Sequence, residues 1–268
     1  MPDTLSYTLL QYCGIDEAWN VCNESVQRLA DRANPFGTYI GQIQKTWIGI
    51  PLRVHRRCLD PMFKVANAIA YDNLMVQATI HKPSQLAALL PISQWVHVEG
   101  HSTGDNHWIL QEGKRVVQIL AYICQAYGKL PSLYIISPFK SVAHAMKKLL
   151  LENNLIPWAA NLAPPAKISQ WVRDSIGTIH SFQGKQAEVV ILLLGGNPKK
   201  PGAISWATKT PNMLNVALTR AQHLCFVVGN YELWAKQPYF NVLTKDMPCN
   251  IHVPDTTSMV AWSSLKRR

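Results

Sequence analysis

The sequence lacks long apolar runs, paired cysteines and low-complexity tracts. Its longest aliphatic run, residues 189–194, has six residues, whereas a membrane-spanning helix needs about 20. Its six cysteines form no C-x-x-C pair, which favours reduced thiols in a cytoplasm over a disulfide framework. The opening residues MPDTL have neither the basic nor the apolar block of a secretory signal. We therefore expect a cytoplasmic protein that does not bind membranes.

Acidic residues are also scarce. The 268 residues include 16 Asp and Glu against 26 Lys and Arg, a formal net charge of +10. Residues 140–220 contain ten of the basic residues and only three acids. An anionic partner such as nucleic acid or a nucleotide suits this excess, although a generic basic surface would look the same. Because 48% of the residues are hydrophobic, the chain can bury a core, and disorder is excluded.

Short apolar segments alternate with helical patterns along the chain. Strands are predicted near residues 51–54, 95–98, 133–137, 178–180, 189–194 and 224–228. Helices are predicted over residues 16–34, 60–71, 109–127, 140–153 and 212–221, and from residue 231. Buried strands separated by helices form parallel βαβ units, so the sequence predicts a doubly wound α/β sheet with a helical N-terminal lead-in. The Gly, Pro and Lys-rich residues 195–211 are predicted as a long loop.

Ligands of open α/β sheets bind at the carboxyl ends of the strands, so polar loops there are candidate sites. Three segments qualify: residues 55–57, 178–188 and 215–221. Arg220 lies among small and apolar residues, and its charge needs an acid, an anion or water. A structural ion pair is the simpler interpretation of one such arginine. Arginines that converge from separate segments would instead favour a phosphate site.

These segments carry a family resemblance. Residues 178–192 (TIHSFQGKQAEVVIL) and 214–221 (LNVALTRA), followed by CFVVGN, closely resemble motifs V and VI of superfamily 1 helicases. Residues 52–57 (LRVHRR) resemble the YR motif of that family, and residues 134–139 (YIISPF) resemble motif IV. The most similar branch is the 5′-to-3′ one that contains the nonsense-mediated-decay helicases. The resemblance implies a RecA-like fold and the second motor domain of an ATP-dependent DNA or RNA helicase or translocase.

The resemblance also implies a role for each matching position. Arg56 and Arg220 match the two arginines that approach the γ-phosphate of ATP bound on the first RecA-like domain. The positions near the nucleotide are matched by His55, Gln183, Gly184 and Gln186. The positions along the backbone of single-stranded nucleic acid are matched by Thr178, His180 and Ser181. Taken singly, each residue has a simpler structural interpretation: a turn cap for Thr178 and Ser181, a core histidine for His180, and a solvated loop side chain for Gln183.

Two of these positions depart from the family pattern. His55 stands where the family often has a tyrosine that stacks on adenine, so stacking would be weakened or taken over by an imidazole. Gln186 stands where a glutamate usually contacts the nucleotide, so that contact would lose its charge. Both changes affect the expected affinity for the nucleotide base and ribose.

The sequence has no G-x-x-x-x-G-K-[ST] phosphate loop, which an ATPase needs to hold the triphosphate and Mg²⁺. Asp16 and Glu17 are interpreted as charge at a helix N-terminus. By resemblance, ATP and Mg²⁺ would be bound mainly by a RecA-like domain upstream in the same protein, and this chain alone is predicted not to hydrolyse ATP. Residues 1–49 would be the lead-in, 50–245 the RecA-like domain and 246–268 a tail.

Other interpretations stay open. A helicase-derived domain without its motor half would serve as a non-enzymatic docking module for nucleic acid or protein. A metal hydrolase is the weaker rival, suggested by His97, Glu99, His101 and His107. No metal is expected at the helicase-like site itself.

Basic loops are predicted to follow the path of the single strand. The segments concerned are residues 140–173 and 199–209. Trp158, Trp171 and Trp206 would either stack on bases or pack in the core or on the surface, with packing the more common role.

Overall fold

The computed structural model describes residues 8–9, 11–15, 19, 26–40, 45–49, 53–80, 83–102, 104–152 and 159–250. The chain divides into two compact units. The first takes in Met1–Val54 and Tyr71–Val76, and the second takes in His55–Ala70 and Gln77–Arg268. Among the described helices, none is both long and apolar enough to cross a membrane.

The first unit contains a helix packed against a small antiparallel hairpin. Helix α2 (Val26–Ala33) is followed by β1 (Gly37–Ile40) and β2 (Thr46–Gly49). The buried Asp31 joins the helix to the hairpin: its Oδ1 accepts the N–H of Gly49 at 3.0 Å, and its carbonyl accepts the indole N–H of Trp47 at 2.9 Å. A buried carboxylate, and not an apolar face, therefore anchors α2.

The structure of this unit differs in part from the helix predicted over residues 16–34. The described helix ends at Ala33, one residue before the predicted end, and its first residue, Val26, is 80% exposed. The remainder of the predicted helix lies largely outside the described residues. The hairpin was missed because four-residue strands are too short to show a periodicity.

Six parallel strands form the sheet of the second unit, in the order β10-β5-β9-β8-β6-β7. They are β5 (Gln94–His97), β6 (Leu133–Ser137), β7 (Ile176–Thr178), β8 (Ala187–Leu193), β9 (Ala221–Gly229) and β10 (Cys249–Asn250). The predicted parallel α/β sheet is confirmed. The edge strand β10 lies in the segment predicted as a tail.

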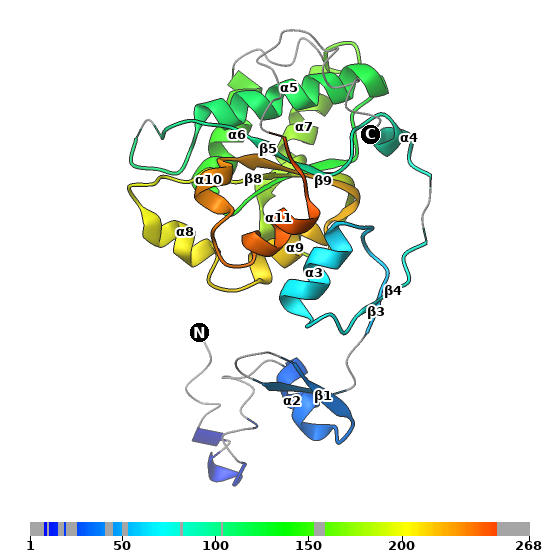
Figure 1. Cartoon of the computed structure of the whole chain (residues 1–268), viewed down its shortest axis with the longest axis vertical. Helices are drawn as coiled ribbons and strands as arrows, with labels where there is room; N and C mark the ends of the chain where they lie inside the picture. The colour runs from blue at the N-terminus through cyan, green and yellow to red at the C-terminus, as the bar shows by residue number, and fades with distance from the viewer. Residues whose placement is uncertain are drawn as a thin grey trace. The chain divides into compact units, whose positions relative to one another are not determined.

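Helices cover both faces of this sheet (Figure 1). One face carries α5 (Leu110–Tyr127), α6 (Lys140–Glu152) and α7 (Pro165–Ser175). The other carries α3 (Met62–Ala70), α9 (Asn212–Leu218) and α11 (Phe240–Asp246). The shorter elements are α4 (Gln85–Ala88), α8 (Pro201–Ala207), α10 (Tyr231–Trp234), β3 (Val54–His55) and β4 (Val76–Gln77).

The core is centred on the adjacent strands β8 and β9. Residues 189–194 are fully buried, as a continuous aliphatic run requires when helices lie on both faces of a sheet. Two buried tryptophans close the core with their N–H groups satisfied. Trp95 donates to the carbonyl of Gly229 at 3.1 Å, and Trp234 donates to the carbonyl of Gly195 at 2.8 Å.

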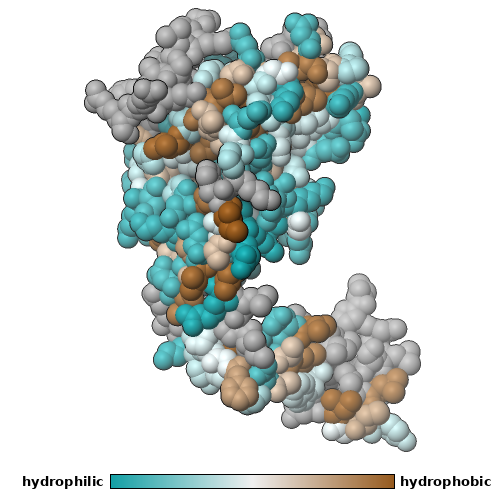
Figure 2. Space-filling model, turned by 90° about the vertical axis from the view of Figure 1, so that its right-hand side faces the viewer, coloured by the Kyte–Doolittle hydropathy of each residue, from teal (hydrophilic) through white to brown (hydrophobic). Residues whose placement is uncertain are grey.

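Two predicted loops contain helices. Within residues 195–211, helix α8 begins at Pro201, because proline is well accommodated in the first turn of a helix. Within residues 140–173, the described part is occupied mainly by α6 and α7. Helix α6 confirms the helix predicted over residues 140–153, but the prediction of basic loops across the segment was wrong, because its lysines are carried on helices that also bury an apolar side against the sheet. Hydrophilic residues cover much of the face of the molecule seen in Figure 2, and hydrophobic residues appear there in scattered patches.

Gly195 turns the chain at the carboxyl end of β8. Its φ is +62°, and a Cβ there would lie 2.5 Å from the carbonyl oxygen of His107. Gly128, at the end of α5, has a φ of +69° but open space around it.

We expect Gly128→Ala to cost about 1–2 kcal/mol of unfolding free energy from left-handed strain alone, and Gly195→Ala to cost clearly more. Urea denaturation measures both, and equal losses would contradict the steric argument.

Candidate functional site

Polar side chains gather where β6 and β7 end. Strand β7 continues directly into a 3-10 helix, Ile179–Phe182, and the N-terminus of α9 lies beside it. Two pockets open here, and three residues line both: Ile179, His180 and Asn212. The larger pocket therefore opens at the carboxyl edge of the sheet, where Thr178 ends β7. The smaller pocket extends along α9 to Gly184 and Arg220, which lie just before the amino ends of β8 and β9.

The smaller pocket, called here the arginine pocket, has a volume of about 490 Å³. Its lining combines Arg57, Gln183, Gly184, Val216 and Arg220 with the three shared residues. None of the described residues that line it is acidic. Two guanidinium groups beside polar donors form a set that suits phosphate oxygens.

Arg220 is held in a fixed position by backbone carbonyls. Its side chain is buried, its Nε donates to the carbonyl of Val216 at 3.2 Å, and its Nη1 donates to the carbonyl of Lys185 at 3.1 Å. The turn that presents Lys185 contains Gly184 with a φ of +80°, a conformation that glycine adopts without strain. Two segments far apart in the sequence thus orient one guanidinium toward the pocket.

Arg57, and not Arg56, lines the arginine pocket. Both side chains are exposed and follow β3, but Arg56 is absent from the described lining of either pocket. The resemblance assigned the phosphate role to Arg56. The signal that pointed to Arg57 was the adjacent arginine pair, which by itself does not tell which member faces a ligand.

The structure does not bring His55 and Gln186 to either pocket. His55 is buried; its Nε2 accepts the backbone N–H of Cys58 at 3.1 Å, and its ring lies 5.1 Å from that of Phe63. Burial, with a smaller contribution from the Arg57 charge, lowers the pKa of His55. Gln186 is exposed and accepts from the Gln222 amide at 3.3 Å. A neutral imidazole packed this way presents no free ring face for an adenine.

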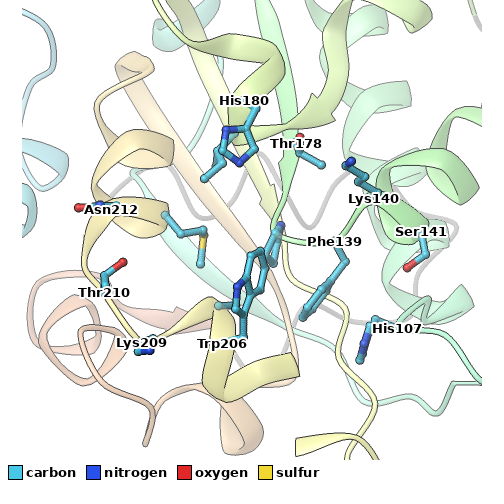
Figure 3. Close-up of a pocket in the computed structure, with 14 residues that line it drawn as sticks. His107, Phe139, Lys140, Ser141, Thr178, His180, Trp206, Lys209, Thr210 and Asn212 are labelled. Carbon is cyan, nitrogen blue, oxygen red and sulfur yellow. The ribbon is translucent and has the colours of Figure 1, made fainter. Parts of the chain in front are cut away.

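The larger pocket, called here the aromatic pocket, has a volume of about 730 Å³ (Figure 3). Besides the shared residues it is lined by His107, Pro138, Phe139, Lys140, Ser141, Thr178, Trp206, Ala207, Lys209, Thr210 and Met213. Thr178 and His180 were predicted as nucleic-acid contacts, and the pocket brings them together. Ser181 is exposed and lines neither pocket.

The charge of the aromatic pocket has one sign. Lys140 and Lys209 are the charged side chains of its described lining, which includes no carboxylate. Lys140 begins α6, directly beyond β6, and Lys209 follows α8. Both lysines lie in segments that were predicted to be basic, without a specific role for either residue. A cationic pocket with an aromatic interior suits an anion that carries an apolar ring.

One wall of the aromatic pocket is fixed by a buried hydrogen-bond network. The His107 ring stacks on Phe139 with centroids 4.2 Å apart, and its Nδ1 accepts the N–H of Asn197 at 3.2 Å. Glu112 Oε2 accepts the N–H of Gly195 at 2.7 Å. Complete burial raises the pKa of Glu112 to about 8. The segment after β8 is therefore attached to His107, which lies shortly before α5, and to Glu112 in the first turn of that helix.

The histidine-rich segment does not assemble a metal centre in the described part of the chain. His97 Nδ1 accepts the backbone N–H of Tyr231 at 2.9 Å, and His97 Nε2 lies 3.6 Å from Glu99 Oε1. His107 is engaged with Phe139 and Asn197, as described above. These contacts give the histidines structural partners and do not support the metal-hydrolase interpretation.

The predicted tryptophans separate into different environments. Trp171 is half-buried and donates its indole N–H to the carbonyl of Pro131 at 3.0 Å, which is a packing role. Trp206 is 64% exposed and lines the aromatic pocket. Trp158 lies outside the described residues.

A comparison with protein families gives one match: a family model described as an AAA domain covers residues 46–232, which is more than half of the chain. The matched range contains strands β5 to β9 and the described lining of both pockets. The match supports a helicase-type NTPase domain with a RecA-like α/β fold. No curated protein matches the chain.

Glu112 generates a testable pH dependence. Because its folded-state pKa, about 8, lies above its ordinary value of 4.5, the folded chain holds a proton between these pH values that the unfolded chain releases. The stability of the protein should therefore fall as pH rises from about 5 to 8. In Glu112→Gln, which retains an acceptor for Gly195, this fall should be smaller by up to a few kcal/mol.

Urea denaturation at pH 5, 6.5 and 8 measures this effect. The exposed Glu232 on α10 offers a matched control, because Glu232→Gln removes a solvent-exposed carboxylate and should leave the pH profile parallel to that of the unmodified chain. A Glu112→Gln profile that is also parallel to the unmodified one would contradict the assigned protonation.

Proposed function

The chain belongs to the AAA domain family, and we propose that it is the second motor domain of an ATP-driven helicase or translocase. In this role it supplies arginines to ATP bound on another RecA-like domain and contacts single-stranded DNA or RNA. The observation that carries the proposal is the arginine pocket. Arg57, Gln183, Gly184 and Arg220 line one cavity in a sequence that contains no phosphate loop.

The arginine pocket suits the γ-phosphate of a nucleotide held elsewhere. Phosphoryl transfer places charge on the phosphate oxygens, and a guanidinium that is already oriented stabilises this charge without reorganisation. The two carbonyl contacts of Arg220 provide that orientation. The residues present do not fit Mg²⁺, whose ligands are carboxylates, waters and phosphates, because the described lining has no acid. Mg²⁺ and the phosphate cradle are therefore assigned to the partner domain.

The aromatic pocket suits the single strand. Lys140, Lys209, His180 and Thr178 are donors for phosphate oxygens around one cavity. Ser181, exposed beside His180, completes the predicted contacts from outside the pocket. Since His180 and Asn212 line both pockets, the proposed nucleotide and nucleic-acid contacts share side chains.

The proposed partner is a RecA-like domain upstream in the same protein. We expect the reading frame before the Met1 codon to encode G-x-x-x-x-G-K-[ST], followed by an Asp-Glu pair, and the purified chain alone to show no ATP turnover. Sequencing the source gene and a phosphate-release assay test these points. Robust ATP turnover by the chain alone would refute the assignment of ATP and Mg²⁺ binding to another domain. A native start at Met1 would favour the non-enzymatic docking module.

Arginine variants in the polypeptide that carries both domains test the catalytic role. Arg220→Ala should lower kcat for ATP by about 10³-fold or more with little change in KM, because the contact is made chiefly in the transition state. Arg57→Ala should have an effect of similar order.

Arg56→Ala is the matched control, since Arg56 is adjacent and exposed but does not line the pocket. Its kcat should stay near that of the unmodified protein. The reverse order, with Arg56→Ala severe and Arg57→Ala mild, would restore the assignment implied by the family resemblance. Unchanged turnover in Arg220→Ala would leave only a docking role.

A further inference from the structure

Trp206 is exposed, whereas the other tryptophans that the structure describes in the second unit are buried or half-buried. Its exposed fraction is 64%, whereas Trp95 and Trp234 are fully buried and Trp171 is half-buried with a carbonyl partner. Exposing a large aromatic side chain forgoes the stabilisation that its burial would give. One such residue is common on a surface, so its exposure alone indicates no ligand.

Packing of α8 does not require Trp206. The helix is anchored by Ile204 and Ala207, which are 3% and 4% exposed. Its end is closed by Thr208, whose hydroxyl donates to the carbonyl of Ile204 at 3.0 Å. Trp206 lies between these anchors in the sequence and lines the aromatic pocket, as does the smaller Ala207.

The surroundings of Trp206 point to a ligand that combines a flat apolar ring with negative charge. Figure 3 shows the indole in the middle of the aromatic pocket, with Lys140 and Lys209 on opposite sides of it. Phe139 lies next to the indole in the same view and is fixed by its stacking on His107. Thr178 and His180 lie across the pocket from Lys209.

The size of the pocket fits one nucleotide unit. Its volume of about 730 Å³ lies within the range of about 300–1,000 Å³ typical of small-molecule sites. A base placed on the indole would have cationic side chains within reach on either side, as the phosphates that precede and follow it in a strand require. A free mononucleotide has the same base chemistry but needs only one of the two lysines.

We infer that Trp206 is the stacking platform for one unstacked base of a single strand, with Lys140 and Lys209 on the flanking phosphates. This role presupposes the nucleic-acid contacts proposed above. Of the two roles that the sequence left open for Trp206, it is base stacking, a contact that the proposed backbone contacts of Thr178, His180 and Ser181 do not provide. Stacking tolerates any base, because every base has a π face. The platform therefore confers affinity for single strands without a sequence requirement.

Fluorescence anisotropy with two labelled oligomers tests the role of Trp206 in the purified chain. One is a thymidine oligomer of about 20 nucleotides, long enough to cover the site sizes usual for single-strand binding. The other has the same length and backbone but abasic tetrahydrofuran units. The unmodified chain should bind the thymidine oligomer about tenfold more tightly, which corresponds to about 1.4 kcal/mol. Trp206→Ala should remove this preference and leave the abasic affinity unchanged.

Three further variants separate stacking from folding and from charge. Trp206→Phe should recover most of the preference, because a phenyl ring still stacks. Trp171→Phe is the matched control and should behave as the unmodified chain, since Trp171 lies outside the pocket lining. Lys209→Ala should weaken the binding of both oligomers to the same extent. Thermal denaturation of Trp206→Ala should show a folded protein, as expected for an exposed side chain.

Each remaining outcome has a distinct meaning. Binding of neither oligomer would overturn the proposed nucleic-acid contacts together with the stacking role. Equal binding of both oligomers, unaffected by Trp206→Ala, would overturn only the stacking role. An equal loss on both oligomers in Trp206→Ala would also overturn it, because stacking cannot act on an abasic strand. Displacement of the thymidine oligomer by an equal concentration of uridine monophosphate would overturn the proposed binding of a strand and would indicate a mononucleotide as the ligand.

Discussion

Burial of the parallel strands β8 and β9 on both faces is the constraint on which the second unit depends. Residues 189–194 have no exposed surface, so the strands themselves carry no chemistry, and polar groups enter only where the strands end. Because neighbouring strands run in the same direction, their carboxyl ends share one edge. The aromatic pocket lies at this edge, and the arginine pocket extends from it along α9 to Arg220, which directly precedes β9. The segments that form the two pockets are far apart in the sequence.

Backbone carbonyls and amides position the side chains of the site. Arg220 is held by the carbonyls of Val216 and Lys185, and the segment after β8 is held by Glu112 and His107. Such contacts keep a cationic pocket open without placing acids in it, which would compete with an anionic ligand. The same principle suits half of a nucleotide site: the guanidinium groups are suited to phosphate oxygens, whereas the described lining contains no carboxylate ligand for Mg²⁺.

Most of the fold could be predicted from local apolar patterning, and the elements that were not predicted have identifiable causes. The strands near residues 133–137, 189–194 and 224–228 were correctly placed, because uninterrupted aliphatic runs are typical of buried parallel strands. The hairpin of β1 and β2 was too short to show a pattern, and α8 was hidden in a stretch rich in Gly, Pro and Lys. In these places tertiary contacts, and not local preference, stabilise the element.

The sequence by itself determined the α/β class, because the apolar pattern marks the buried parallel strands. It also singled out Thr178, His180, Gln183, Gly184 and Arg220, which line the two pockets. Only the tertiary structure decided which side chains face the cavities. In the tertiary structure Arg57, and not Arg56, lines the arginine pocket, His55 is buried against Phe63, and Trp206 is exposed. The reason is geometric: a step of one residue points a side chain in a different direction, and the packing of distant segments selects which direction meets a ligand.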